Sequence, residues 1–433
     1  MSPSRVSPLV VALVLSMTLV GFCVSAMTLT ALGIAYDAPG GNALHKLHPA
    51  TFIAALAFLA RVTTDPQPLA YLAGLPSRFP GVAFFCVMWT MTIAYAVLEQ
   101  SAPIMPLFDT FFFGMVFLVL FDEFDDEARG RLRILVHAVM IANAALGIIE
   151  FATHWRLTPF VTGGAAIEHD YRSTALFGHP LLNAATTAAY IVALVYRADK
   201  GANPLLFAGV IALQGVAMVA FGGRTAIVLT LALVGFHALR RLVGIARGGR
   251  FDMRAAGLAL TAAPVVLALA ALAYRAGYLD EIVSRFTNDK GSTQARVVLY
   301  DLFDYFSIED LLFGPDPQQL ATAQNTLGIE YGVENSWIGF LFQYGALMTG
   351  AFVAGFLALY LEIWRRAAAG RLALTLMFFV EVTSAAAISV KSFEFNHFVV
   401  IVLALAGARA SKSAVDRAVA SRPPYLVLRP ERA

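Results

Sequence analysis

Four arginines are the residues whose type and placement best fit the binding of an anionic substrate. Arg172 lies shortly before His179, Arg224 separates two apolar runs, and Arg285 and Arg296 lie in the long polar stretch that follows. A guanidinium group stays charged at physiological pH and binds phosphate oxygens through two parallel hydrogen bonds. If the fold brings several of them together, they can bind a pyrophosphate. The alternative for each arginine is an ion pair with a nearby acidic residue or contact with lipid headgroups.

A carboxylate and an amide, Glu334 and Asn335, directly precede the apolar run that begins at Ser336. At this position Glu334 could act as a general base that takes a proton from a sugar hydroxyl. Asn335 could cap the following helix or hold the acceptor. The alternative for Glu334 is structural, since the positive end of a helix dipole favours an acidic residue.

A short helix is expected in the polar stretch, from near Gln294 to near Phe306. Arg296, Tyr300 and Asp304 then recur every four residues and share one face, with an apolar stripe beside them. Such a helix would present a cation and a phenol to the same cavity.

The sequence lacks the patterns of several other kinds of site. No cluster of Cys, His, Asp or Glu has metal-ligand spacing in these stretches, and no phosphate-loop or dinucleotide-binding motif is present. We therefore expect neither a metal nor another cofactor. The net charge of +2 does not indicate a nucleic-acid partner.

The elements that must position these residues are membrane-spanning helices. Hydrophobic residues make up 59% of the 433 residues, only 14% are charged, and the mean hydropathy is +0.70. Soluble domains carry about 25% charged residues, so a soluble enzyme is excluded. The apolar runs predict an all-α polytopic membrane protein with about twelve spans. We expect these spans at residues 9–36, 49–60, 80–98, 103–121, 132–151, 180–197, 204–221, 224–243, 255–276, 336–363, 372–390 and 397–409.

Basic residues divide unequally between the two sides of this topology. Most of the 31 Lys and Arg residues fall in the N-terminus, the even-numbered loops and the tail 410–433. The positive-inside rule therefore places both termini in the cytoplasm. The long loop 277–335 and the four arginines then lie in the periplasm. We expect one transmembrane domain, 1–433, in the bacterial inner membrane, with short helices in its periplasmic loop.

In these stretches the sequence resembles the O-antigen ligase and polymerase family, inner-membrane glycosyltransferases that act on polyprenyl-pyrophosphate-linked sugars. The matching stretches are Arg172-Ser-Thr-Ala-Leu-Phe-Gly-His-Pro-Leu-Leu-Asn183, Phe221-Gly-Gly-Arg-Thr-Ala226, Arg296 to Gly314, and Glu334-Asn-Ser-Trp to Gly345. There are two departures. Glu334 stands where the ligases have a histidine, and Gly345 is followed by Gly350 rather than by a glycine three residues later. Both favour the polymerase branch.

The resemblance implies a GT-C-like fold with a periplasmic active site beneath the long loop. It implies that Arg224 and Arg296 contact the pyrophosphate and that Glu334 is the base or orients the acceptor. The other residues expected to contact substrate are Arg172, His179, Arg285, Tyr300 and Asn335.

The implied activity is that of an exopolysaccharide or O-antigen polymerase. It would transfer a glycan from a polyprenyl-pyrophosphate donor to a lipid-linked repeat unit, with inversion and without a metal. Membrane lipid, a flippase and a chain-length regulator are the further partners expected. An O-antigen ligase or a protein O-oligosaccharyltransferase would use the same donor with another acceptor.

The alternative from a different class is a transporter or a lipid-linked-sugar flippase. Such a protein would carry internal repeats and several deep polar residues. Only Glu381, in the middle of the run 372–390, is a clear deep charge, and it must be protonated, paired or facing a cavity. The sequence therefore favours the transferase.

Overall fold

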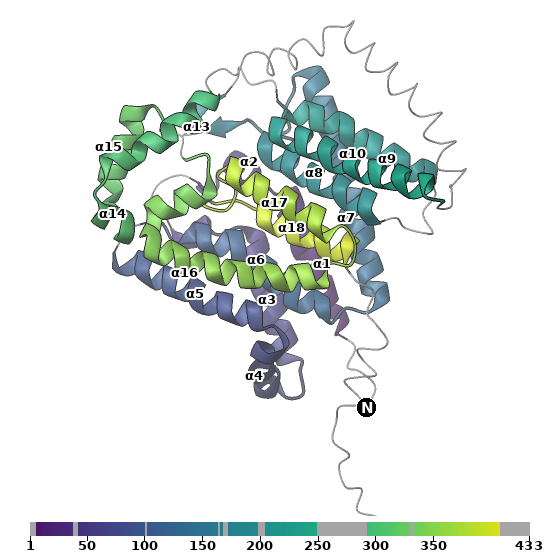
Figure 1. The fold of residues 1–433 in the computed structure, drawn as a ribbon. Coiled ribbons are helices and arrows are strands. Elements are labelled where there is room, and N and C mark those ends of the chain that lie inside the picture. Colours follow the sequence, from purple (N-terminus) through teal and green to yellow (C-terminus); the bar gives the residue numbers. More distant parts are fainter. Residues whose placement is uncertain are drawn as a thin grey trace, which may run out of the picture.

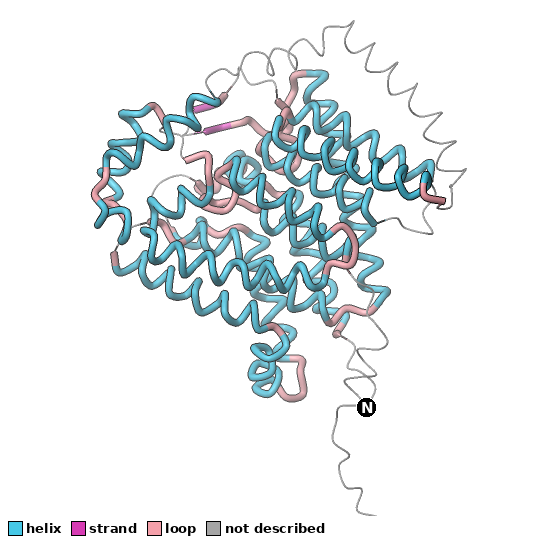
Figure 2. The backbone as a smooth tube through the Cα atoms, in the orientation of Figure 1, coloured by secondary structure: helices cyan, strands magenta, loops and turns pink. Residues whose placement is uncertain are grey.

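The chain is almost entirely helical wherever the structure, a computed structural model, describes it (Figures 1 and 2). The described residues are 6–37, 42–99, 102–162, 165–167, 172–197, 204–248, 292–329 and 333–407. Their β structure is an antiparallel ribbon of β1 (Val161–Thr162) and β2 (Ala165–Ala166) and an isolated bridge between Ala367 and Gly407. This ribbon is a small addition to the all-helical expectation.

Many of the helices begin at a proline, which suits the first helical position because the N–H it lacks would have no partner there. The helices of the first part are α1 (Pro8–Cys23), α2 (Ala26–Ala31), η1 (Ala43–Lys46), α3 (Pro49–Thr63), α4 (Pro68–Arg78), α5 (Pro80–Leu98), α6 (Met105–Asp122) and α7 (Asp126–Thr153). Those of the second part are α8 (Pro180–Arg197), α9 (Pro204–Phe221), α10 (Arg224–Ala246), α13 (Ser292–Asp301), η2 (Leu302–Tyr305), α14 (Ile308–Phe313), α15 (Pro317–Leu327), α16 (Ser336–Arg366), α17 (Arg371–Ser384), α18 (Glu394–Ile401) and the π-helical turn η3 (Val402–Ala406).

Five helices in the described ranges are long and apolar enough to cross a membrane, namely α5, α6, α7, α10 and α16. Shorter apolar helices lie at α1, α3, α8, α9 and α18. The chain is therefore a helical protein with the composition and the helices of a membrane protein.

The expected spans within the described ranges overlap helices, and two of them, 80–98 and 204–221, match α5 and α9 residue for residue, while α17 ends at Ser384, before the end of the span 372–390. The span 255–276 lies outside the described residues, as does the tail 410–433. The run 9–36 is not one helix, because α1 ends at Cys23 and the hydroxyl of Ser25 starts α2 by accepting a hydrogen bond from Thr28 N at 3.1 Å. Sequence reasoning also missed α4.

The helices α5 and α16 pack side by side in opposite directions (Figure 1). Near the start of α5, Gly81 N donates to the Glu362 carboxylate at 3.0 Å, close to the end of α16. Near the end of α5, the Tyr95 hydroxyl donates to the carbonyl of Phe313, the last residue of α14. We call the end of the bundle at which α5 ends, α16 begins and α14 lies the cap end.

A kink at Gly345 interrupts α16 and receives the end of α14. Gly345 has φ +71°, and a Cβ there would lie 2.4 Å from the carbonyl oxygen of Leu312. Gly314, with φ +94°, lies against the same kink, so two backbones meet without side chains between them. Only glycine accepts these positive φ values without strain. Gly314 and Gly345, each of which ends one of the stretches that match the family, therefore pack directly against each other.

The segment from α13 to α15, which we call the cap, has a small core of its own, the cap core. Its buried members are Leu299, Leu302, Ala323, Ile329, Val333 and Phe342. The ring of Phe342, on α16, lies 5.1 Å from that of Phe303 and 5.5 Å from that of Phe306. The cap is therefore attached to the bundle through the first turns of α16.

Candidate functional site

Arg172 and Arg224 lie on two segments that meet at the cap end, and we call residues 172–176 and 221–224 the arginine turn. Ser173 N donates to the carbonyl of Ala220 at 3.0 Å, which holds the first segment against the end of α9. Close packing holds the second segment, because a Cβ on Gly223 would lie 2.4 Å from the Cβ of Ala184 on α8. The side chains of both arginines are half-buried.

His179 begins the helix that supports this turn. Its Nδ1 accepts from Leu181 N at 3.3 Å, and its ring lies 5.5 Å from that of Phe160. Gly178 before it has φ +72° and packs against Ser25, so a side chain there would collide with the start of α2. His179 therefore has a structural task at the start of α8, whatever else it contacts.

Sequence reasoning missed Glu150, near the end of α7. Only 2% of this residue is exposed, and its carboxylate accepts hydrogen bonds from Ser173, Thr174 and Ala175 of the arginine turn. Nothing local in the sequence marks it, since these three partners are 23 to 25 positions away.

A groove of about 510 Å³ lies at the cap end between α13, the start of α16 and the outer part of α17. We call it the cap groove. Three of the expected site residues line it, Tyr300, Glu334 and Asn335. The other lining residues are Leu299, Leu376, Phe379, Val380, Thr383 and Ser384. The groove therefore has an apolar wall on α17 and a polar rim.

The rim residues differ in how firmly they are held. Asn335 caps α16, because its side-chain oxygen accepts from Trp337 N at 3.0 Å and Ile338 N at 3.2 Å. Glu334 is exposed and lies just outside this helix, and 62% of Tyr300 is exposed. The capping alternative for Asn335 is thus confirmed, and Glu334 lies on the exposed rim of the groove.

The expected helix around Arg296 differs in its course. It begins at Ser292, ends at Asp301 and continues as η2, so Asp304 does not continue the face of Arg296 and Tyr300 as it would in one α-helix. The backbone of Arg296 lies in α13 at the cap end, and its side chain lies outside the described structure. Arg285 also lies outside the described residues.

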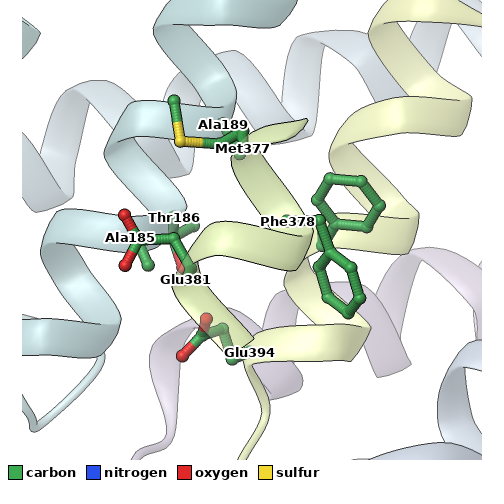
Figure 3. A pocket seen from close by; sticks show the side chains of 8 residues that line it. Ala185, Thr186, Ala189, Met377, Phe378, Glu381 and Glu394 are labelled. Carbon is green, nitrogen blue, oxygen red and sulfur yellow. The ribbon is translucent and has the colours of Figure 1, made fainter. Parts of the chain in front are cut away.

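The helix α17 lies between α16 and the helices α8 and α10 (Figure 1), and one of its faces lines the cap groove. Its opposite face, with Glu381, points into a cavity of about 10 Å³, which is room for one water molecule. Glu394 of α18 reaches the same cavity, next to Thr186 of α8 (Figure 3). Glu381 and Glu394 are 8% and 9% exposed. Of the three alternatives given for Glu381, the structure shows that it faces a cavity.

A second buried carboxylate that sequence reasoning missed ties several cap-end loops together. Asp109 of α6 accepts from the Tyr36 hydroxyl at 2.8 Å, from His48 N at 3.0 Å and from the Thr51 hydroxyl at 2.7 Å. Lys391 donates to the Tyr36 carbonyl at 2.8 Å. These bonds fix the loop before α18.

Within the part of the chain that the structure describes, no group of three or more His, Cys, Asp or Glu residues is placed to hold a metal ion. In comparisons with known proteins, no family model, no curated protein and no solved structure matches this chain.

Proposed function

We propose that the chain is a glycan polymerase, which transfers a glycan from a polyprenyl-pyrophosphate donor to a lipid-linked sugar repeat unit. One observation carries the proposal. Glu334, Asn335 and Tyr300 line one groove at the end of the bundle where Arg172 and Arg224 also lie. The proposal includes a GT-C-like bundle of about twelve spans in the bacterial inner membrane, with the cap in the periplasm.

In the proposed reaction the acceptor hydroxyl attacks the anomeric carbon of the donor sugar. The carboxylate of Glu334 takes the hydroxyl proton, the new glycosidic C–O bond forms, and the bond to the pyrophosphate breaks. Arg224 and Arg296 stabilise the charge that develops on the departing pyrophosphate, and Arg172 and Arg285 are proposed as further contacts to the substrate. A single displacement inverts the anomeric carbon.

The lining of the cap groove suits a sugar that is attached to a lipid. On α17, Leu376 and Val380 lie one helical turn apart and are 47% and 38% exposed. Thr383 continues this face toward the polar rim. An acceptor can therefore place its hydroxyl groups near Glu334 while its lipid remains beside the apolar side chains.

The activity test uses the purified protein mixed with a lipid-pyrophosphate-linked repeat unit. A polymerase yields lipid-linked chains of increasing length, and free polyprenyl pyrophosphate accumulates. Transfer only to an added glycolipid or protein acceptor would instead identify a ligase or an O-oligosaccharyltransferase. No turnover with any acceptor would refute the transferase proposal.

A transporter or flippase is the second candidate, and the interior carboxylates favour it. Glu394 adds a second deep acidic residue to Glu381, and paired acidic residues inside a bundle are typical of ion-coupled transporters. Proteoliposomes with and without a proton gradient separate the two functions. Gradient-dependent movement of a lipid-linked sugar without bond formation would replace the transferase proposal.

Sidedness is tested by labelling single cysteines in intact cells. A cysteine at the exposed position Thr322 of α15 should react with a reagent applied from the periplasm, and one at Ser413 should not. The reverse pattern would remove every periplasmic role proposed above.

A further inference from the structure

Glu150 is one of the most heavily hydrogen-bonded side chains at the cap end. Its Oε2 accepts from the Ser173 hydroxyl at 2.7 Å, from Thr174 N at 3.0 Å and from Ala175 N at 2.8 Å. Its Oε1 accepts from Leu157 N at 2.9 Å. Consecutive backbone N–H groups of this kind form a concave site for an anion, and here the anion is the protein's own carboxylate.

The backbone around this carboxylate is held in an uncommon conformation. Ala175 has φ +38°, a left-handed value that residues with a side chain seldom adopt. Such a conformation persists only where the surrounding contacts fix it. Glu150 supplies these contacts, and Asn143, two turns earlier on α7, adds one by accepting from Leu176 N at 3.0 Å.

The same segment is tied to both arginines. Arg156 donates to the carbonyl oxygen of Arg172 at 3.2 Å, and Ser173 N donates to the carbonyl of Ala220, four residues before Arg224. One network therefore runs from α7 through residues 172–175 to the end of α9. At its centre Glu150 holds the backbone that directly follows Arg172.

We propose that Glu150 is a positioning residue for the donor pyrophosphate, one that acts by fixing the backbone from which Arg172 binds it. This inference rests on the proposed function, in which Arg172 and Arg224 contact the donor. Glu150 itself is buried and holds the backbone donors, so it does not touch the substrate. Its removal should weaken donor binding only as long as Arg172 is present.

The test is a double-mutant cycle on the full chain in lipid nanodiscs, with a fluorescent polyprenyl pyrophosphate as the probe. Arg172→Ala should weaken binding about tenfold, the scale of a lost charged hydrogen bond. Glu150→Ala should cost nearly as much, and the double variant should bind no more weakly than either single variant. Glu150→Gln retains one acceptor oxygen and should lose less.

The matched control is Glu362→Ala, which removes another buried carboxylate, 3% exposed, at the opposite end of the bundle. It should lower thermal stability and leave probe binding unchanged. If Glu150→Ala does not accumulate as folded protein, Glu150→Gln takes its place in the cycle.

The outcomes separate the two proposals. Additive losses, or wild-type binding in the Glu150 variants, would overturn the positioning role while the pyrophosphate role of Arg172 stands. Wild-type binding by both Arg172→Ala and Arg224→Ala would overturn the proposed function, and the positioning role with it.

Discussion

The arginine turn and the cap groove lie at the same end of the bundle and are built in opposite ways. In the arginine turn, a carboxylate that is 2% exposed accepts hydrogen bonds from three consecutive residues, Ser173 to Ala175. In the cap groove, Glu334 is exposed and Tyr300 is 62% exposed. The arginine turn is therefore fixed by hydrogen bonds inside the bundle, and the cap groove exposes its polar side chains at the surface.

The difference matches the two tasks of a transferase. A leaving pyrophosphate needs charges that are already in place, because electrostatic stabilisation is strongest when nothing must reorganise during the reaction. The acceptor in the proposed reaction is a new lipid-linked repeat unit in every cycle, which must enter the site each time, so an open groove suits it. The same contrast is not expected of a transporter, in which both regions would move with the substrate.

The largest loss of activity is expected at Glu334, in the cap groove. Glu334→Gln keeps the shape of the side chain and removes the base, so transfer should fall by roughly 10²- to 10⁴-fold while donor binding survives. Turnover of a lipid-linked repeat unit and binding of a polyprenyl pyrophosphate are measured on the same preparation. A glutamine variant that polymerises like the wild type would reduce Glu334 to a residue favoured by the helix dipole.

Glu334→His is the companion variant, because it restores the residue of the ligases. An imidazole could retain part of the activity, with a pH optimum moved toward its ordinary pKa of about 6.5. The pH profile then tells base catalysis from simple orientation of the acceptor, since orientation does not depend on the imidazole pKa.

The next largest loss of activity is expected at Arg224, in the arginine turn. Arg224→Ala should lower kcat/KM by about 10²- to 10³-fold, the range for the loss of one electrostatic stabiliser. Arg224→Lys should recover only part of it, because an ammonium is a point charge without the guanidinium fork. Full activity of the alanine variant at wild-type protein levels would contradict the pyrophosphate role.

The apolar runs locate the helices well because they are local signals. Pro80 and Pro204 sit at the first positions of helices whose ends also match the expected spans. The interior partners could not be predicted in this way. Glu150, Asp109 and Glu394 acquire their significance from contacts across the fold, and the residues they meet are distant in the sequence.

The candidate site was predicted only in part, for the same reason. The sequence predicts Glu334, Asn335 and Tyr300 as site residues, and the structure shows that they line one groove. The apolar wall of that groove on α17 was not foreseen, because the run 372–390 gives no sign of which face is exposed. The break at Ser25 was missed because a single capping hydroxyl inside a long apolar run has little effect on the average hydropathy.

A smaller effect is expected where the cap meets the bundle. Gly345→Ala places a side chain at φ +71° and against the backbone of α14, so it should lower the stability of the cap by roughly 2 kcal/mol. Gly350→Ala is the matched control, since a Cβ there meets nothing within 4 Å. Alanine in that open helical position should be neutral or slightly stabilising. Equal thermal stabilities of the two variants in detergent would show that the kink is not required.

The smallest effect is a pH dependence confined to α14. Hydrogen bonds from the Ser307 hydroxyl and backbone N–H lower the pKa of Asp310 below its ordinary value of 3.8. A lowered pKa in the folded state stabilises α14 above pH 3.8, and this contribution is lost as the pH falls through the lower, folded-state pKa. Hydrogen exchange of the α14 amides, corrected for intrinsic rates, should accelerate on acidification below about pH 4.

Asp310→Asn should abolish that acid-dependent change, because the amide keeps an acceptor oxygen but does not titrate. The amides of Thr174 and Ala175 provide the internal comparison, since they bond to a carboxylate buried in the bundle. They should stay protected over the range in which α14 opens. If the arginine turn exchanged as early as α14, the two regions would not differ in rigidity, and the division between a fixed donor region and an open acceptor region would be wrong.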